Sequence, residues 1–411
     1  MRFLYTPVIP PFGGAGQNES VIADLMAELG SRGGVRVSVD GFEDPAPLVY
    51  VMATGGTERT LLDLQARRSV FRTGEPVVLV AHPGNNSLPA SLEVLARLQQ
   101  DGVPGRIVFV RGPQDEAGLA TLEAAIADVA VRMRLLDTRV GLVGEPSDWL
   151  VASSPDADVV RETWGPTVIA IGMDELEAEI DAVSADTVEA GVASLSGDST
   201  GCVEPTPGDL ADVARVTSAM EALVERYDLD AVSLRCFDLL VSRETTGCFA
   251  LSALTDAGVM AGCEGDLVST VGMLWANLLT GELPWMANPS ELDETADTLK
   301  LAHCTIARGM LERYRLRSHF ESGQGVGIQG DLPLGPVTVL RIGGAEMEAL
   351  WLAEGEIVAR GDAENLCRTQ VDIALTDGAV SDLLHTPLGN HIVMIRGHHA
   401  ARLADWWETM L

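Results

Sequence analysis

The stretch CEGDLVSTVGMLWANLLTGELPWMAN, residues 263–288, decides the architecture of the middle of the chain. The small apolar run AGVMAGC before it predicts a buried strand that ends at Cys263. Asp266 is a suitable N-cap, and the apolar spacing after it predicts a long helix over Asp266–Thr280. Strands and helices in alternation are the units of an α/β sheet. Glu264 therefore stands at the end of a strand, where open α/β sheets bind ligands.

The same alternation of apolar strands and helices fills the chain before this stretch. Strands are predicted at Arg2–Ile9, Leu48–Ala53, Pro76–Ala81, Arg106–Arg111, Thr167–Met173 and Asp230–Arg235. A further strand, followed by a turn and a helix, is predicted to open at Arg139 in RVGLVGEPSDWL. Helices are predicted at Ser20–Arg32, Pro89–Asp101, Gln114–Leu136, Asp174–Ala185 and Asp209–Tyr227. Near-continuous apolar strands between helices indicate parallel sheets covered on both faces. We expect two Rossmann-like, doubly wound domains, at residues 1–138 and 139–297.

From residue 298 the helical periodicity fades and short runs alternate with turns. Strands are predicted at Thr298–His303, Pro336–Ile342, Glu346–Glu354, Glu356–Arg360, Gln370–Leu375 and His391–Arg396. The final stretch, HHAARLADWWETML, predicts an apolar-striped helix. We therefore expect a β-rich, barrel-like domain over residues 298–411 that ends in a helix.

Charge and cysteine usage narrow the class of protein. The formal net charge is −32, from 60 acidic and 28 basic residues, and this field repels nucleic acid and anionic membranes. The six cysteines form no CxxC pair and no disulfide-dense module, so they are expected to be buried thiols in a reducing cytoplasm. The start, MRFLYTPVIPPFGGAG, is expected to form a strand and a loop rather than a signal peptide.

Residues 263–288 and the later segment LGNHIVMIRGH, residues 388–398, resemble the metal-binding segments of the L-fucose isomerase family, which is related to L-arabinose isomerase. That family has a Glu at the start of a helix, an LTG turn at its end, a second acidic ligand 24 residues after the first, and a C-terminal His. The resemblance covers residues 230–400 by motif and the earlier part by layout. It implies a cytoplasmic ketol isomerase, an intramolecular oxidoreductase, that forms homo-oligomers, often hexamers, with active sites between subunits.

The resemblance implies three metal ligands in this chain. Glu264 matches the glutamate that is both ligand and proton-transfer base, and His391 matches the histidine ligand. Asn390 matches an asparagine that contacts the substrate. Asn288 stands where the family has Asp, so it can still offer an oxygen to a cation but carries no charge and takes no proton. The implied cofactor is Mn²⁺ or another divalent cation such as Mg²⁺ or Co²⁺.

The change to Asn288 leaves the acid–base chemistry open in three ways. Aldose–ketose isomerisation by an ene-diol needs a base and an acid beside C1 and C2. Glu264 could carry the proton alone, Glu321 or Asp293 could replace the missing acid, or a hydride could shift between the two carbons. Asp266 is a poor substitute because two helical positions turn it ~200° away from Glu264.

Polar motifs in the β-rich segment suit a sugar pocket. Of the seven histidines only His82 precedes this segment. The residues expected to bind substrate are His303, Thr305, His319, Glu321 and Arg368, beside Asn390. Arg368 is either a salt bridge on the barrel or a clamp for an anionic group, which would suit a sulfonated hexose such as sulfoquinovose. Trp285, Trp351, Trp406 and Trp407 are candidate platforms for sugar stacking.

The sequence therefore predicts a divalent-metal-dependent aldose–ketose isomerase of a monosaccharide. Two other functions fit the same residues. One is a lyase or epimerase on the same scaffold that uses the metal to stabilise an enolate. The other is a sugar-binding protein without catalysis, which would fit the loss of an acidic ligand at Asn288.

Overall fold

The computed structural model describes residues 1–10, 19–197 and 199–411, so the loop predicted after the first strand extends into residues outside the described ones. The chain forms two compact units, Met1–Leu136 with Asp405–Leu411 and Asp137–Ala404. The second unit contains the predicted second Rossmann-like block and most of the β-rich segment, while the boundaries at residues 138 and 297 stay predictions. Within the described ranges, no helix has both the length and the apolar character needed to cross a membrane.

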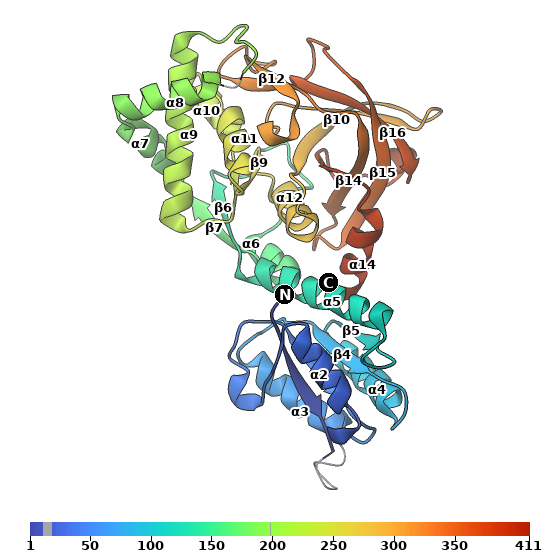
Figure 1. The fold of residues 1–411 in the computed structure, drawn as a ribbon. Coiled ribbons are helices and arrows are strands. Elements are labelled where there is room, and N and C mark those ends of the chain that lie inside the picture. The colour runs from blue at the N-terminus through green and yellow to red at the C-terminus, as the bar shows by residue number, and fades with distance from the viewer. Residues whose placement is uncertain (11–18, 198) are drawn as a thin grey trace. The chain divides into compact units, whose positions relative to one another are not determined.

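The first unit is a parallel sheet with helices packed against it (Figure 1). Its strands are β1 (Phe3–Val8), β2 (Gly34–Arg36), β3 (Leu48–Met52), β4 (Val77–Ala81) and β5 (Gly105–Phe109), in the order β2-β1-β3-β4-β5. Its helices are α2 (Ala23–Ser31), η1 (Val39–Gly41), α3 (Glu58–Ser69), α4 (Ser87–Gln100) and α5 (Glu116–Asp137). Every residue of β3 and β4 is buried, as expected for central strands of a sheet covered on both faces.

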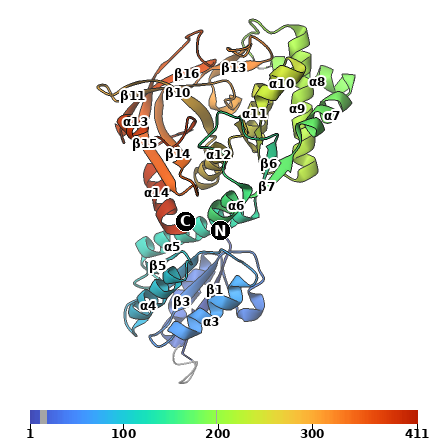
Figure 2. The same cartoon turned by 180° about the vertical axis from the view of Figure 1, so that it is seen from behind.

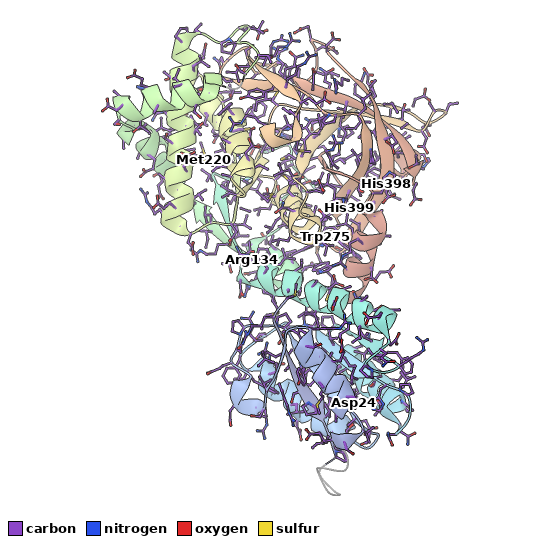
Figure 3. The ribbon with its side chains drawn as sticks, in the orientation of Figure 1. Asp24, Arg134, Met220, Trp275, His398 and His399 are labelled. Atoms are coloured by element: carbon purple, nitrogen blue, oxygen red, sulfur yellow. The ribbon has the colours of Figure 1, made fainter. Side chains whose placement is uncertain are left out.

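The second unit begins with another parallel sheet. Its strands are β6 (Arg139–Val143), β7 (Thr167–Ile171), β8 (Ala231–Leu234) and β9 (Met260–Cys263), in the order β7-β6-β8-β9. Its helices are α6 (Ala157–Val159), η2 (Val160–Trp164), α7 (Met173–Ala182), α8 (Ala185–Gly197), α9 (Pro207–Tyr227), α10 (Cys236–Arg243), α11 (Cys248–Asp256) and α12 (Leu267–Thr280). Met220 of α9 and Trp275 of α12, both labelled in Figure 3, are fully buried. Asp266 caps α12 as predicted, because its side chain accepts a hydrogen bond from the backbone N–H of Ser269.

The same unit contains a closed antiparallel barrel (Figure 2). Its strands, in order around the barrel, are β10 (Trp285–Asp293), β11 (Thr298–His303), β16 (Thr369–Asp377), β15 (Ala349–Arg360), β14 (Gly335–Gly343) and β17 (Ile392–Arg396). A two-stranded ribbon, β12 (Arg313–Arg317) and β13 (Gly327–Asp331), and the short helices η3 (Arg308–Met310), α13 (Ser381–His385) and α14 (Ala400–Met410) complete the chain. The parallel α/β sheets and the β-barrel of the predicted fold class are confirmed, while the arrangement as two Rossmann-like, doubly wound domains stays a prediction.

The strands of the barrel differ from the predicted strands in two places. The barrel begins at β10, before residue 298, and Pro289 lies at a bulge where the register of β10 against β11 shifts. The predicted strands Glu346–Glu354 and Glu356–Arg360 are one strand, β15, because Gly355 lies against the backbone of Ala374 instead of making a turn. A glycine inside a strand thus marks a close backbone approach here.

Candidate active site

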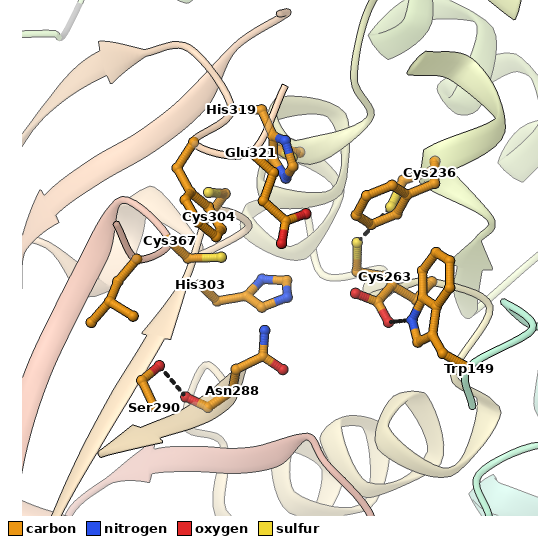
Figure 4. Close-up of a pocket in the computed structure, with 15 residues that line it drawn as sticks. Trp149, Cys236, Cys263, Asn288, Ser290, His303, Cys304, His319, Glu321 and Cys367 are labelled. Atoms are coloured by element: carbon orange, nitrogen blue, oxygen red, sulfur yellow. Dashed lines mark hydrogen bonds between the residues drawn. The ribbon is translucent and has the colours of Figure 1, made fainter. Parts of the chain in front are cut away.

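A cavity of about 390 Å³ lies in the second unit, where the ends of parallel strands face the barrel (Figure 4). A volume of this size suits a small ligand such as a monosaccharide. The lining residues are Trp149, Cys236, Phe237, Cys248, Cys263, Glu264, Asn288, Ser290, His303, Cys304, His319, Phe320, Glu321, Leu366 and Cys367. The structure therefore brings together the predicted residues Glu264, Asn288, His303, His319 and Glu321.

Glu264 is presented by an unusually tight turn from β9 into α12. Glu264 has φ +64° and Gly265 has φ +71°, so two successive residues are left-handed. A side chain at Gly265 would place its Cβ 2.7 Å from Pro146 Cα, so only glycine fits there. A non-glycine residue in this region costs of order 1–3 kcal/mol and is retained mainly at functional sites. The backbone of Glu264 thus marks the same residue as the sequence motif did.

Aromatic side chains orient the Glu264 carboxylate. Trp149, in the loop after β6, donates a hydrogen bond from Nε1 to Glu264 Oε2 at 2.6 Å. The Trp149 ring packs edge-on against Phe237 with centroids 5.0 Å apart, and Phe237 packs edge-on against His319 at 5.7 Å. One side of the pocket is therefore an aromatic wall that holds the carboxylate in a fixed direction.

A buried ionic network holds His391, which directly precedes β17. Its Nδ1 lies 2.8 Å from Asp266 Oδ2, and Arg341 Nη1 lies 3.3 Å from the same oxygen. Burial raises the pKa of Asp266, but the charge of Arg341 and the hydrogen bond with His391 outweigh it and leave that pKa below its ordinary value. Because the ionised Asp266 carboxylate accepts a hydrogen bond from Nδ1–H, the lone pair of the His391 ring lies on Nε2.

The observation that bears on the predicted metal is that His391 Nε2 has no hydrogen-bond partner. This buried atom has no hydrogen-bond partner and lies 3.8 Å from Glu264 Oε2. Asn288, on β10, lines the pocket beside Glu264. Within the described ranges no group of three or more His, Cys, Asp or Glu side chains is arranged to hold a metal ion. Glu264 and His391 are two such donors and the Asn288 amide is a third of another type, so the set fits a divalent cation.

His303 and His319 face the same space from the barrel side. His303 Nδ1 lies 2.8 Å from Thr305 Oγ1, so Thr305 holds His303 rather than lining the pocket itself. Burial, followed by the charges of His391 and His319, lowers the pKa of His303 well below its ordinary value. Burial and the charge of Arg368 lower the pKa of His319 from 6.5 to about 4. Both rings are therefore neutral near pH 7, which suits hydrogen bonding to sugar hydroxyls.

The two acids considered as substitutes for the missing carboxylate lie in different places. Glu321 points into the pocket (Figure 4), and burial together with the charge of Glu264 raises its pKa. Asp293 ends β10, where its Oδ1 accepts hydrogen bonds from the backbone N–H groups of Thr295 and Ala296. Asp293 thus stabilises a turn, and Glu321 is the acid that shares the pocket with Glu264.

Arg368 and Asn390 are not among the pocket-lining residues. Arg368 donates to Ser318 O at 2.8 Å and to Glu364 Oε2 at 2.9 Å, so its guanidinium forms the salt bridge considered from the sequence. Asn390 is exposed. His398 and His399, labelled in Figure 3, follow β17 and also lie outside the lining.

Sequence reasoning missed several pocket residues. None of the four tryptophans considered for stacking lines the pocket, and Trp285, Trp351 and Trp406 are buried in the cores. Trp149 lines it instead, and its position after the predicted strand that opens at Arg139 was a usable signal. Asp266 was interpreted as a cap alone, although it also holds His391 across 125 residues of sequence.

Comparison with known proteins gives distant relatives and no matching family model. The chain is 23% identical over 249 residues to a protein named sulfoquinovose isomerase from Alkalicoccus urumqiensis, a match that covers 57% of this chain and 54% of that protein. It is 21% identical over 313 residues to proteins of the same name from Priestia aryabhattai and Priestia megaterium, which covers 72% of this chain and 68% of each relative. The chain thus spans about half the length of the first of these relatives.

Proposed function

We propose that the chain is an aldose–ketose isomerase of a monosaccharide, with its active site in the pocket around Glu264. The observation that carries the proposal is the pairing, in one cavity, of the Glu264 and Glu321 carboxyl groups with the neutral rings of His303 and His319. The names of the distant relatives agree with this class of enzyme.

The two carboxyl groups supply the acid and base that the reaction needs. Trp149 holds Glu264 in a fixed direction, so Glu264 takes the proton from C2 of the sugar and returns it to C1. Glu321, whose pKa is raised, keeps its proton to higher pH than an ordinary carboxyl group. Glu321 therefore protonates O1 of the aldose and recovers a proton from O2. This assignment gives Glu321 the role that Asn288 cannot fill.

A divalent cation would be held by His391 Nε2, the Glu264 carboxylate and the Asn288 amide oxygen. Such a cation, Mn²⁺ in the first instance, polarises two adjacent sugar oxygens when it is bound. Asp266 and Arg341 contribute by fixing the ring of His391 with its lone pair toward Glu264.

We further propose that the substrate is a sulfonated hexose such as sulfoquinovose. The support is the name that all three relatives share. No Lys or Arg is among the described residues that line the pocket, and Arg368 is paired with Glu364. A cation for the sulfonate would then come from another copy of the chain in a homo-oligomer, as the family resemblance implies.

The experiment is conversion of a sugar panel by the purified protein, with its metal content measured before and after chelation. The panel contains sulfoquinovose, glucose, L-fucose and L-arabinose. Isomerisation that disappears with chelator and returns with Mn²⁺ supports the proposal. Metal without isomerisation points to a lyase or epimerase, and sugar binding that is indifferent to chelator points to a binding protein.

The acid–base assignment has its own test in deuterated water. Proton transfer through Glu264 places solvent deuterium at C1 of the ketose, or at C2 of the aldose in the reverse reaction, whereas a hydride shift leaves deuterium out of the carbon skeleton. Glu321→Gln should lower kcat by about 10²-fold and remove the loss of activity at high pH, while Asp293→Asn should behave like the unchanged protein. A Glu321→Gln enzyme with full activity would contradict the role of Glu321.

A further inference from the structure

The pocket wall is rich in thiols that the proposed reaction does not use. Five of the six cysteines line it: Cys236, Cys248, Cys263, Cys304 and Cys367. The sixth, Cys202, is exposed and is not among the lining residues. A cavity that admits a small polar substrate also admits a small oxidant, so an oxidant can reach the sulfurs that border it.

Two of these thiols are already in contact. Cys236 Sγ and Cys263 Sγ lie 2.9 Å apart, drawn as a dashed line in Figure 4. β8 and β9 are neighbouring parallel strands in which Leu234 pairs with Cys263, and Cys236 begins α10 two residues further on. The backbone N–H of Cys263 also donates to Met286 Sδ at 3.1 Å. Both sulfurs are therefore presented to each other by regular secondary structure.

Metal binding does not explain the sulfur cluster. In the parts of the chain that the structure describes, no group of three or more cysteine, histidine or carboxylate side chains is arranged around a common metal position. A structural disulfide is also absent, since Cys236 and Cys263 are free thiols. Two thiols in contact, next to a cavity, form the arrangement of an oxidisable cysteine pair.

We propose that Cys236 and Cys263 form a reversible disulfide when the protein meets a hydroperoxide. One thiol of the pair attacks the peroxide O–O bond, becomes a sulfenic acid and releases water or an alcohol. The neighbouring thiol then attacks the sulfenic sulfur, which forms the S–S bond and releases water. The peroxide accepts the two electrons that the two thiols lose. A dithiol reductant reverses the step.

The disulfide between Cys236 and Cys263 would affect the Glu264 carboxylate through the backbone that joins Cys263 to Glu264. Cys263 directly precedes Glu264, whose backbone is left-handed and therefore sensitive to restraint. Both sulfurs also border the cavity, so joining them changes its wall. We expect the oxidised protein to lose isomerase activity, a consequence that rests on the proposed function, whereas formation of the disulfide does not.

The test treats the full-length protein with hydrogen peroxide, alkylates it after denaturation and maps the peptides by mass spectrometry. The expected result is a loss of two alkylatable thiols and one cross-linked peptide pair that contains Cys236 and Cys263, both reversed by dithiothreitol. Cys236→Ser should lose the cross-link, and the matched control Cys202→Ser should keep it. A cross-link between Cys304 and Cys367 instead, or sulfinic acid without any cross-link, would overturn the proposal.

A second measurement covers the case in which Cys236→Ser does not fold. Phenylarsine oxide, which joins two neighbouring thiols, is added to the native protein before alkylation. Protection of Cys236 and Cys263 together supports the pair, and alkylation of both at the untreated rate refutes it. If peroxide forms the disulfide in a protein without isomerase activity, the proposed function fails while the cysteine pair stands.

Discussion

The two parallel sheets of this molecule have the same order for their first four strands, yet the residues that follow those strands differ in the parts that the structure describes. In the first sheet, β4 is followed by His82, whose Nδ1 and Nε2 lie 2.9 Å from Pro83 O and 3.0 Å from Ala53 O. In the second sheet, β9 is followed by Glu264 at the wall of a cavity. His391, which faces Glu264, has a buried Nε2 without a partner.

The difference teaches that strand order does not make a site. At the end of β4 the polar groups satisfy one another, as when Ser87 Oγ donates to Met52 O at 2.6 Å. At the end of β9 a second structure, the barrel, supplies Asn288 and His303 across the cavity. Function therefore depends on the side chains that follow the strands and on what faces them.

The largest expected effect is on the reacting group of the second sheet. Glu264→Gln should lower kcat by about 10³-fold, because an amide cannot accept the C2 proton. Sugar conversion is the measurement, and thermal melting verifies the fold. Asp293→Asn is the matched control, since that carboxylate caps a turn on the same barrel. A kcat of Glu264→Gln within a few-fold of that of the unchanged protein would contradict the proposed role of Glu264 in proton transfer.

The turns after the strands give the next effect. Gly265→Ala should lower the free energy of unfolding by about 3 kcal/mol, from a left-handed φ and a Cβ pressed against Pro146. Gly84, in the turn after β4, has φ +88°, and a Cβ added there would meet no atom within 4 Å. Gly84→Ala should therefore lower the free energy of unfolding by only about 1 kcal/mol. Urea denaturation measures the free energy of unfolding of both variants. Equal losses would contradict a steric cost of the Cβ at position 265.

The histidines of the pocket make stability depend on pH. Burial and Arg368 lower the pKa of His319 from 6.5 to about 4, so in that interval the unfolded chain binds more protons than the folded one. The free energy of unfolding should therefore fall as pH falls from 6.5 to about 4, by at most roughly 3 kcal/mol for this group. His303, shifted in the same direction, adds to the slope. Denaturation series across this interval measure it, and His319→Gln should flatten the curve.

The smallest effect concerns the first sheet. His82→Ala removes both ring contacts and should lower the free energy of unfolding by about 2 kcal/mol. The kcat of the folded protein should stay unchanged, because His82 is buried and bonded at both nitrogens. Thermal melting and sugar conversion are measured on the same sample. A large loss of kcat without loss of stability would mean that the first sheet also takes part in the reaction.

Sequence patterns predicted the fold well where apolar periodicity was continuous. The buried strands β3 and β4 were found because parallel strands covered on both faces are apolar throughout. The start of the barrel was missed because Pro289 and the polar residues around it are untypical of a strand interior, although Pro289 lies at a bulge. The glycine at 355 likewise led to the prediction of two strands in place of β15, because local propensity does not show what packs against a backbone.

The pocket was predictable only in part. Glu264, His303 and Glu321 were found because each stands in a short motif of small and polar residues. Trp149 and Cys236 were not found, because one enters the cavity from the loop after β6 and the other from the start of α10, and only the sheet brings these segments together. The pairing of Asp266 with His391 joins the start of one helix to the start of a distant strand, and no local pattern contains that information.

The position of β17 has a consequence for the order in which the barrel and the pocket form during folding. β17 pairs with β10 on one side and β14 on the other, so it closes the barrel, and it follows the other barrel strands in the sequence. His391 directly precedes it. Until β17 docks, Asp266 lacks His391 as a partner, and such long-range closure is slow. We expect the folding chain to place His391 beside Glu264 and to close its barrel in a single late step.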